Sequence, residues 1–145
     1  MTTADESARN LAVIRRYFAV IADGPTGAEL DEFFDPAVVQ EEFPNRLLPD
    51  GVTRDMAGLR EAASRGLALL REQRFELLDA FASGSRVAAE SAWTGTVGQD
   101  IGPFKAGTVL RARFAQIFEL KNGRIVKLRN YDCIYPWQES SSPGA

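Results

Sequence analysis

The sequence contains no histidine, and this absence excludes several kinds of chemistry at once. Ser-His and Cys-His nucleophile pairs, histidine metal sites and acid–base catalysis by imidazole are all ruled out. If the protein is an enzyme, its protons have to move through carboxylates, tyrosine, lysine, the thiol or bound water. We expect neither a metal ion nor an organic cofactor.

Cysteine is almost absent as well, because Cys133 stands alone. A single thiol excludes an internal disulfide framework and fits a reducing compartment, so the cytoplasm is the expected location. The chain has no apolar run long enough to cross a bilayer, and its first residues lack the apolar core of a signal peptide. A net charge of −3 lacks the basic excess that nucleic-acid binding requires. We therefore expect neither a membrane nor a nucleic acid as a partner.

What is present is the composition of an ordinary globular domain, with 45% hydrophobic and 26% charged residues in a chain of 145. This length suffices for a substantial core. We predict a single domain over residues 1–137. The remaining segment, 138–145, reads QESSSPGA and is predicted to be a disordered tail because it is polar and rich in serine.

Apolar residues recur at helical spacing in three segments of the first half of the chain. Thr3 and Glu6 form a capping box for the first helix, and Thr26 and Glu29 form another for a short second helix. Thr53 is placed to cap a third helix.

Alternating patterns predict strands in the segments Val38 to Phe43, Arg74 to Phe81, Arg86 to Val97, and the two runs on either side of Asn122-Gly123. Three helices combined with these strands favour an α+β fold, in which the helices pack against one side of a curved antiparallel sheet.

The clearest element is the hairpin from Gly107 to Trp137, because Asn122-Gly123 suits a two-residue turn that needs positive φ at both positions. Side-chain alternation on its second strand groups Val126, Leu128, Asn130 and Asp132 on one face. This face begins apolar and ends polar, as the floor of a small-molecule pocket would. A strand end that emerges into solvent is the alternative interpretation.

From Ser7 to Trp137 the chain resembles the NTF2-like superfamily, and within it the SnoaL-like polyketide cyclases and the limonene-epoxide-hydrolase type proteins. The resemblance is carried by the order of the elements, by FFDP after the short helix, and by the closing LKNGRIVKLRNYDCIYPW. It implies three N-terminal helices and a cone-shaped curved antiparallel (mixed) sheet that enclose a deep pocket, usually in a homodimer. The superfamily includes isomerases, cyclases, hydrolases, dehydratases and binding domains, so the resemblance specifies the fold better than the reaction.

The polar residues of the epoxide-hydrolase branch are not retained here. Its tyrosine and asparagine before a proline correspond to Gln40 and Glu42, and its arginine and aspartate on the long strand correspond to Ser91 and Trp93. The aspartate of its last strand matches Asn130. Water attack on an epoxide by that arrangement is therefore not expected.

In the SnoaL-like cyclases an acidic residue near the end of the sheet performs acid–base work, and Asp132 is similar in placement. We predict Asp132 and Glu42 as catalytic residues, since two carboxyl groups in an apolar cavity raise each other's pKa and can divide the roles of acid and base. The predicted substrate-binding residues are Asn130, Gln40, Gln116, Trp93, Phe114, Ser91 and Tyr17.

Several of these assignments have open alternatives. Glu42 could point outward if the strand slips by one residue. For Trp93, a place in the hydrophobic core is as consistent with the sequence as contact with a substrate. Arg111, Arg113 and Arg129 share the outer parity, which favours a solvated or dimer-forming surface over an anion site. Cys133 also has outward parity and no histidine partner, so it is not expected to be a catalytic thiol.

The favoured function is a cofactor-independent acid–base enzyme of cyclase or isomerase type, acting on a small, largely apolar oxygenated or polyketide-like molecule. Two other functions remain open at this point. One is a binding or dimerisation module without catalysis, and the other is an epoxide hydrolase with a rearranged acid pair.

Overall fold

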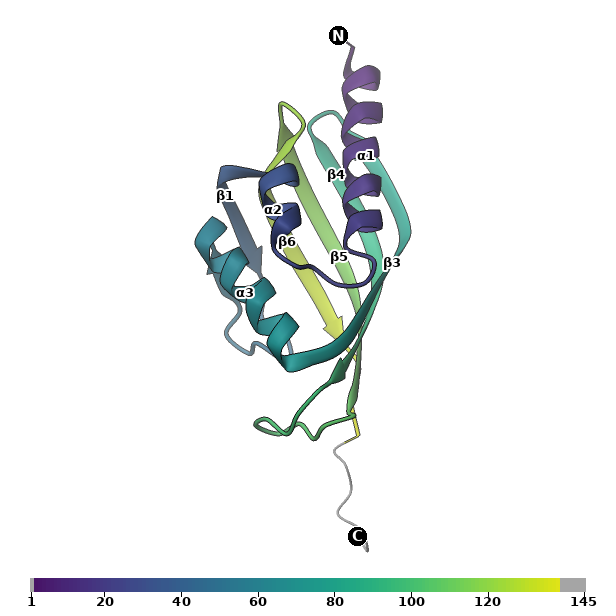
Figure 1. Cartoon of the computed structure of the whole chain (residues 1–145). Coiled ribbons are helices and arrows are strands. Elements are labelled where there is room, and N and C mark those ends of the chain that lie inside the picture. Colours follow the sequence, from purple (N-terminus) through teal and green to yellow (C-terminus); the bar gives the residue numbers. More distant parts are fainter. Residues whose placement is uncertain (1, 139–145) are drawn as a thin grey trace, which may run out of the picture.

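The computed structural model describes residues 2–138, where helices and strands build one curved sheet with helices on one side (Figure 1). The elements are α1 (Thr3–Val20), α2 (Ala28–Phe33), β1 (Phe34–Glu42), β2 (Val52–Arg54), α3 (Met56–Leu69), β3 (Leu70–Ser83), β4 (Arg86–Val97), β5 (Val109–Lys121) and β6 (Arg124–Ile134). The predicted α+β fold with a curved sheet is confirmed. The predicted tail begins at Gln138, and its residues 139–145 lie outside the described part of the chain.

The six strands lie in the order β2-β1-β6-β5-β4-β3. The β1–β6 pair is parallel and the other neighbours are antiparallel, so the sheet is mixed. β4 has the predicted bounds. β3 begins at Leu70, four residues before the expected Arg74, and β2 was not predicted.

Helix α1 begins one residue earlier than its predicted capping box. Thr2 is the N-cap residue, its hydroxyl accepts from the backbone N–H of Asp5, and the Asp5 carboxylate accepts from the N–H of Thr2. The prediction of Thr3 and Glu6 as the box is wrong, because aspartate three residues after threonine completes the same reciprocal pair of hydrogen bonds.

The starts of the other two helices also differ from the predicted caps. Gly27 is the N-cap of α2, although Glu29 does bind the backbone before the helix, through the N–H groups of Thr26 and Gly27. Asp55 caps α3 with its carboxylate, and Thr53 lies in β2 instead. Aspartate is an equally good cap, so sequence preference did not distinguish these two positions.

The predicted turn between β5 and β6 is confirmed by the positive φ angles of Asn122 (52°) and Gly123 (76°). A register shift just after the turn leaves Val126 without a direct partner on β5. Ile125 is therefore fully buried in place of Val126, which corrects the predicted inner face at its first position. From Leu128 onwards the predicted alternation holds.

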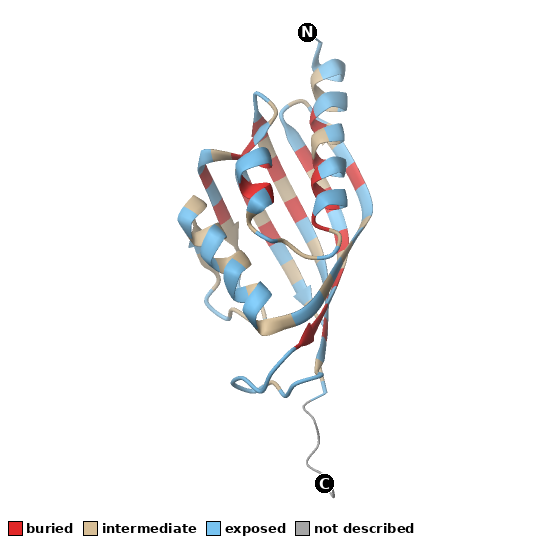
Figure 2. Cartoon of the chain, in the orientation of Figure 1, coloured by how far each residue is buried: buried red, intermediate tan, exposed pale blue. Residues whose placement is uncertain are grey.

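All three helices lie over one face of the sheet, with α1 above β3 and β4 and α3 above β1 (Figure 1). Buried residues concentrate on the strand face beneath the helices and on the sides of α1 and α2 that meet it (Figure 2). The largest fully buried side chains of this layer are Phe33, Phe34, Phe118, Ile14 and Ile125. No helix within residues 2–138 has the length and apolar character needed to span a membrane.

Candidate functional site

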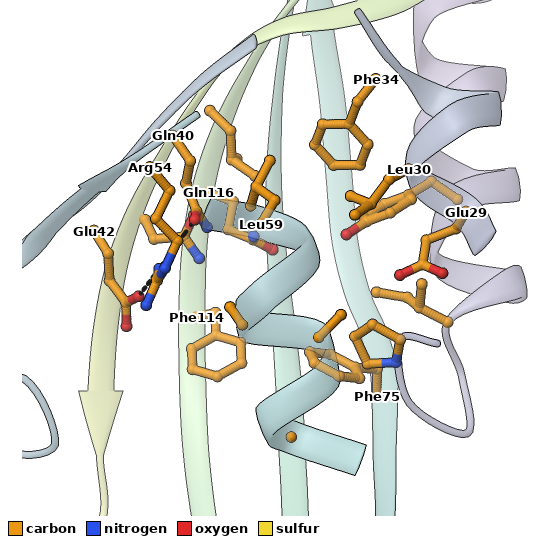
Figure 3. A pocket seen from close by; sticks show the side chains of 18 of the residues that line it. Glu29, Leu30, Phe34, Gln40, Glu42, Arg54, Leu59, Phe75, Phe114 and Gln116 are labelled. Atoms are coloured by element: carbon orange, nitrogen blue, oxygen red, sulfur yellow. Dashed lines mark hydrogen bonds and ion pairs between the residues drawn. The ribbon is translucent and has the colours of Figure 1, made fainter. Parts of the chain in front are cut away.

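A cavity of about 250 Å³ lies between the inner face of the sheet and the helices (Figure 3). Part of its wall is polar and is formed by Gln40, Glu42, Arg54, Gln116, Asn130 and Asp132. Most of the remaining wall is apolar and includes Leu30, Phe34, Leu59, Phe75, Phe114 and Leu128. A hollow with apolar walls and a few convergent polar groups is the usual form of a small-molecule site.

Strand pairing explains why the polar groups meet. Residues on neighbouring strands that are in register point to the same face, and Asn130 is in register with both Glu42 on β1 and Gln116 on β5. Gln40 and Asp132 lie two residues away along β1 and β6, so they point inward as well. The predicted parity thus brings together residues that are far apart in the sequence.

Arg54 of β2 ties the β1 residues into a network. Its guanidinium Nη1 donates to Glu42 Oε2 at 2.8 Å and to Gln40 Oε1 at 3.0 Å. Gln40 in turn donates through Nε2 to Asn130 Oδ1 at 3.1 Å. The side chains of Arg54 and Glu42 are only 12% and 16% exposed. Asn45 Nδ2 also donates to Glu42 Oε1 at 3.3 Å, so both carboxylate oxygens of this mostly buried ion pair are bonded, which favours its persistence.

Asp132 lies against this network, and its acid strength is strongly altered. Burial, followed by the contact with the Glu42 carboxyl group, raises the pKa of Asp132 to about 8. Asn130 and the charge of Arg54 act in the opposite direction and are outweighed. Asp132 Oδ1 is buried and accepts no hydrogen bond within residues 2–138. A proton on this carboxyl group removes the repulsion from Glu42, so near neutral pH Asp132 is an acid beside a carboxylate held by arginine.

Most of the predicted site residues line the cavity. Seven do so: Tyr17, Gln40, Glu42, Phe114, Gln116, Asn130 and Asp132. Glu42 points inward, which settles the open question of its orientation.

Ser91 and Trp93 differ from the prediction because neither is part of the cavity wall. Trp93 packs behind the lining residues Phe75 and Phe114, at ring-centroid distances of 6.5 and 6.1 Å, and its indole N–H donates to Gln73 Oε1 at 3.2 Å. Ser91 is fully buried, and its hydroxyl has no partner among the described residues. Phe114, which is in register with Ser91 on the neighbouring strand, lines this part of the cavity.

Sequence reasoning missed Arg54 and the second role of Glu29. Arg54 directly follows Thr53, the predicted cap of the third helix, and was given no role in the site. It lies in β2, and a strand of three residues has no periodicity that would indicate its direction. Glu29 was assigned only as a helix cap, yet it is 4% exposed and lines the cavity.

On the outer face of the sheet the prediction holds for two of the three arginines, whereas Arg129 is half-buried and its Nε atom has no hydrogen-bond partner among the described residues. Arg111 and Arg113 are exposed, and Arg113 pairs with Glu90 at 3.3 Å across the strands. Cys133 is exposed and free. Within residues 2–138 no group of acidic or thiol side chains is arranged to hold a metal ion.

An open mixed sheet curved around a cavity, with its helices on the inner side, defines an α+β cone of the NTF2-like type. The chain belongs to the SnoaL-like domain family, whose model matches residues 14–128. Asn130 and Asp132 lie just beyond the matched segment. No curated protein shows a significant match to the sequence.

Solved structures share this fold at low sequence identity. A phenazine biosynthesis-related protein from Pseudomonas aeruginosa is 15% identical over 90% of this chain and 83% of its own, with a TM-score of 0.74. A candidate polyketide cyclase from Acidithiobacillus ferrooxidans is 19% identical over 86% and 87%, with a TM-score of 0.68. An LEH-like epoxide hydrolase from Mycobacterium tuberculosis is 14% identical over 88% and 85%, with a TM-score of 0.63.

Proposed function

We propose that the protein is a cofactor-independent enzyme of cyclase or isomerase type, in which Asp132 and Glu42 act as an acid–base pair. The observation that carries the proposal is the raised pKa of Asp132, about 8, beside the Glu42 carboxylate in a cavity with both apolar and polar walls. Perturbed carboxyl groups of this kind concentrate at catalytic sites. Candidate polyketide cyclases among the structural neighbours support an oxygenated, polyketide-like substrate.

The proposed chemistry begins with proton transfer next to a carbonyl group. Glu42 takes the proton from the carbon, while Asp132 gives its proton to the carbonyl oxygen, so that an enol forms without a free enolate. Returning the first proton to a different carbon and the oxygen's proton to Asp132 completes an isomerisation. If the enol carbon instead attacks a second carbonyl of the same molecule, the O–H proton of the enol returns to Asp132 as the first carbonyl re-forms. The proton on Glu42 then goes to the new alkoxide, and a ring closes.

The neighbouring polar groups suit this role. Asn130 and Gln116 carry amide N–H donors into the cavity near the acid, where they can stabilise charge that develops on oxygen. Arg54 fixes the Glu42 carboxylate through an ion pair of 2.8 Å, so the proposed base is held in one orientation.

Deuterium exchange tests the proposal without the natural substrate. In D₂O, the protein is expected to accelerate exchange α to the carbonyl of β-tetralone, a small apolar ketone. Asp132→Asn and Glu42→Gln should each slow the exchange by about 100-fold or more, the usual contribution of a positioned acid or base. Because protonated Asp132 is the active form, the rate should fall as pH rises through about 8.

Glu41→Gln is the matched control, because Glu41 is the neighbour of Glu42 and has the opposite parity on β1. It should leave the exchange rate unchanged. Equal rates in wild type, Asp132→Asn and Glu42→Gln would overturn the proposal and favour a binding module. Incorporation of labelled water into a diol from an apolar epoxide would favour the hydrolase, which the LEH-like neighbour makes the second candidate.

The proposal includes a homodimer formed through the outer face of the sheet, which exposes Leu78 (39%) and Phe81 (66%). It also includes a location in the cytoplasm. The free, exposed thiol of Cys133 supports this, because a reducing compartment keeps such a thiol unpaired.

A further inference from the structure

Glu29 is a buried carboxylate that the proposed chemistry does not use. It belongs to the first turn of α2, is 4% exposed and lines the cavity. Its Oε2 atom accepts from the backbone N–H groups of Thr26 at 3.2 Å and Gly27 at 2.9 Å, and from the Thr26 hydroxyl at 3.4 Å. Its Oε1 atom accepts nothing from residues 2–138. One oxygen therefore holds the loop, and the other is available to a ligand.

The hydroxyl group of Tyr17 is the second unused polar group of the cavity. Tyr17 is 9% exposed and lines the cavity, and its ring is packed edge-on against Phe33 and Phe34 at 5.5 Å. The hydroxyl has no hydrogen-bond partner within residues 2–138. Burial and, after it, the charge of Glu29 raise the pKa of Tyr17, so the hydroxyl stays protonated and lies within the field of that carboxylate.

Glu29 lies apart from Glu42, the proposed base. Figure 3 shows Glu29 on the opposite side of the cavity from Glu42 and Arg54, with apolar side chains such as Leu59 and Phe114 in the space between them. A ligand that fills the cavity thus meets a polar group at each end and an apolar wall in the middle.

We propose that Glu29 and Tyr17 form a specificity site for a hydroxyl group at the end of the ligand remote from Asp132. A hydroxyl donates to Glu29 Oε1 and accepts from Tyr17 Oη, which satisfies both groups at once. A ketone oxygen has no proton to give and would face the carboxylate unpaired, and a ligand carboxylate would be repelled. The substrate class is therefore an apolar ring compound with the reacting carbonyl at one end and a hydroxyl at the other.

This inference rests on the proposed function for the reacting end of the ligand, but its test needs no turnover. Calorimetry would compare binding of 4-phenylcyclohexanol, 4-phenylcyclohexanone and 4-phenylcyclohexylamine. The alcohol should bind about 10- to 100-fold more tightly than the ketone, the range for a hydrogen bond to a charged group. The amide resonances of Thr26 and Gly27, which are bonded to Glu29, should shift with the alcohol and show at which end it lies.

Glu29→Gln is the decisive variant. Its amide oxygen can still accept from Thr26 and Gly27, while its NH₂ group replaces the free acceptor by a donor, so the preference should move toward the ketone. Tyr17→Phe should weaken binding of the alcohol. Asp31→Asn, on the exposed side of the same helix with a side chain 74% exposed, should change neither. Melting temperatures of all variants would confirm that they fold.

Three results would overturn the proposal. They are equal affinity of the wild type for alcohol and ketone, an alcohol preference that survives in Glu29→Gln, and tighter binding of the amine than of the alcohol. Failure of the catalytic proposal looks different. It would appear as missing deuterium exchange in a protein whose alcohol preference, including that of Asp132→Asn, is intact.

Discussion

At the scale of a single residue, the proton on Asp132 links the proposed chemistry to stability. Its pKa is about 8 in the folded protein, against 3.8 for an ordinary aspartate. Between these two values the folded state holds a proton that the unfolded state has lost. The free energy of unfolding therefore falls as pH rises across this window, and Asp132 contributes to that fall.

Asp132→Asn should accordingly be more stable than the wild type, and the difference should grow with pH. Asparagine is neutral in both states, so it avoids the penalty that the buried aspartate imposes above its unfolded pKa. We expect little difference at pH 4 and a gain of several kcal/mol at pH 8.5, because each unit of pKa difference contributes about 1.4 kcal/mol. Denaturant unfolding at the two pH values measures it. Parallel stability curves for the two proteins would contradict the raised pKa.

Single residues also show how far the sequence predicts the site. Strand parity was enough to place Asn130 and Asp132 in the cavity, because each side chain of a long strand can point only to one face of the sheet or to the other. Arg54 could not be found in this way, since its strand is too short to show a period. Glu29 satisfies the helix start with one oxygen and faces the cavity with the other, and only the fold reveals the second contact.

At the scale of elements, the loop after β1 fixes the position of Glu42. Gly51 closes this loop just before β2 with a φ of +66°. A Cβ atom there would lie 2.6 Å from the backbone oxygen of Glu42 and 3.1 Å from the nitrogen of Pro44. The absence of a side chain at Gly51 thus lets the returning chain pack directly on the residue that is proposed as the base.

Gly51→Ala should therefore impair both stability and the proposed exchange reaction. A left-handed φ costs an alanine about 1 kcal/mol, and the backbone clash should add to this, for a total loss of roughly 2–3 kcal/mol. Gly123→Ala is the matched control, because Gly123 has a φ of +76° but nothing within 4 Å of its Cβ position. Gly123→Ala should lose only the stability that the left-handed φ costs an alanine, and it should keep full exchange activity. Equal losses in the two variants would show that the contact with Glu42 does not matter.

The elements themselves were predictable to different degrees. The β5–β6 turn and the bounds of β4 follow from local chemistry, namely Asn122-Gly123 and a long alternating run. The early start of β3 was missed because Leu70 continues the spacing of the preceding helix. The register shift near Val126 was missed because an inserted residue in a strand needs no special side chain.

At the scale of the whole molecule, the outer face of the sheet is the surface that the proposed homodimer would use. Phe81 of β3 is in register with Ala88 of β4, which is in register with Ile117 of β5, so the three form an apolar row across the strands. Phe81 is 66% exposed, an unusual state for a phenylalanine in a sheet. Covering this row with a second copy would remove it from water.

Phe81→Glu should convert a dimer into a monomer in sedimentation velocity at micromolar concentration, because it places a charge at the exposed end of the row. Leu67→Glu is the control, since Leu67 is 53% exposed on α3, which covers the other face of the sheet. It should leave the mass unchanged. A wild type that sediments as a monomer at this concentration would contradict the proposed dimer.

The parallel pairing of β1 with β6 has a consequence for the order in which the protein acquires its site. Gln40 and Asn130, which are hydrogen-bonded across this pair, are 90 residues apart in the chain. Closing so large a loop is slow compared with the formation of local hairpins such as β5–β6. Glu42 and Asp132 are therefore not in contact during synthesis and early collapse. The unfavourable contact between these two carboxyl groups forms only after the last strand has emerged. By then the rest of the cone can form and hold the two groups together.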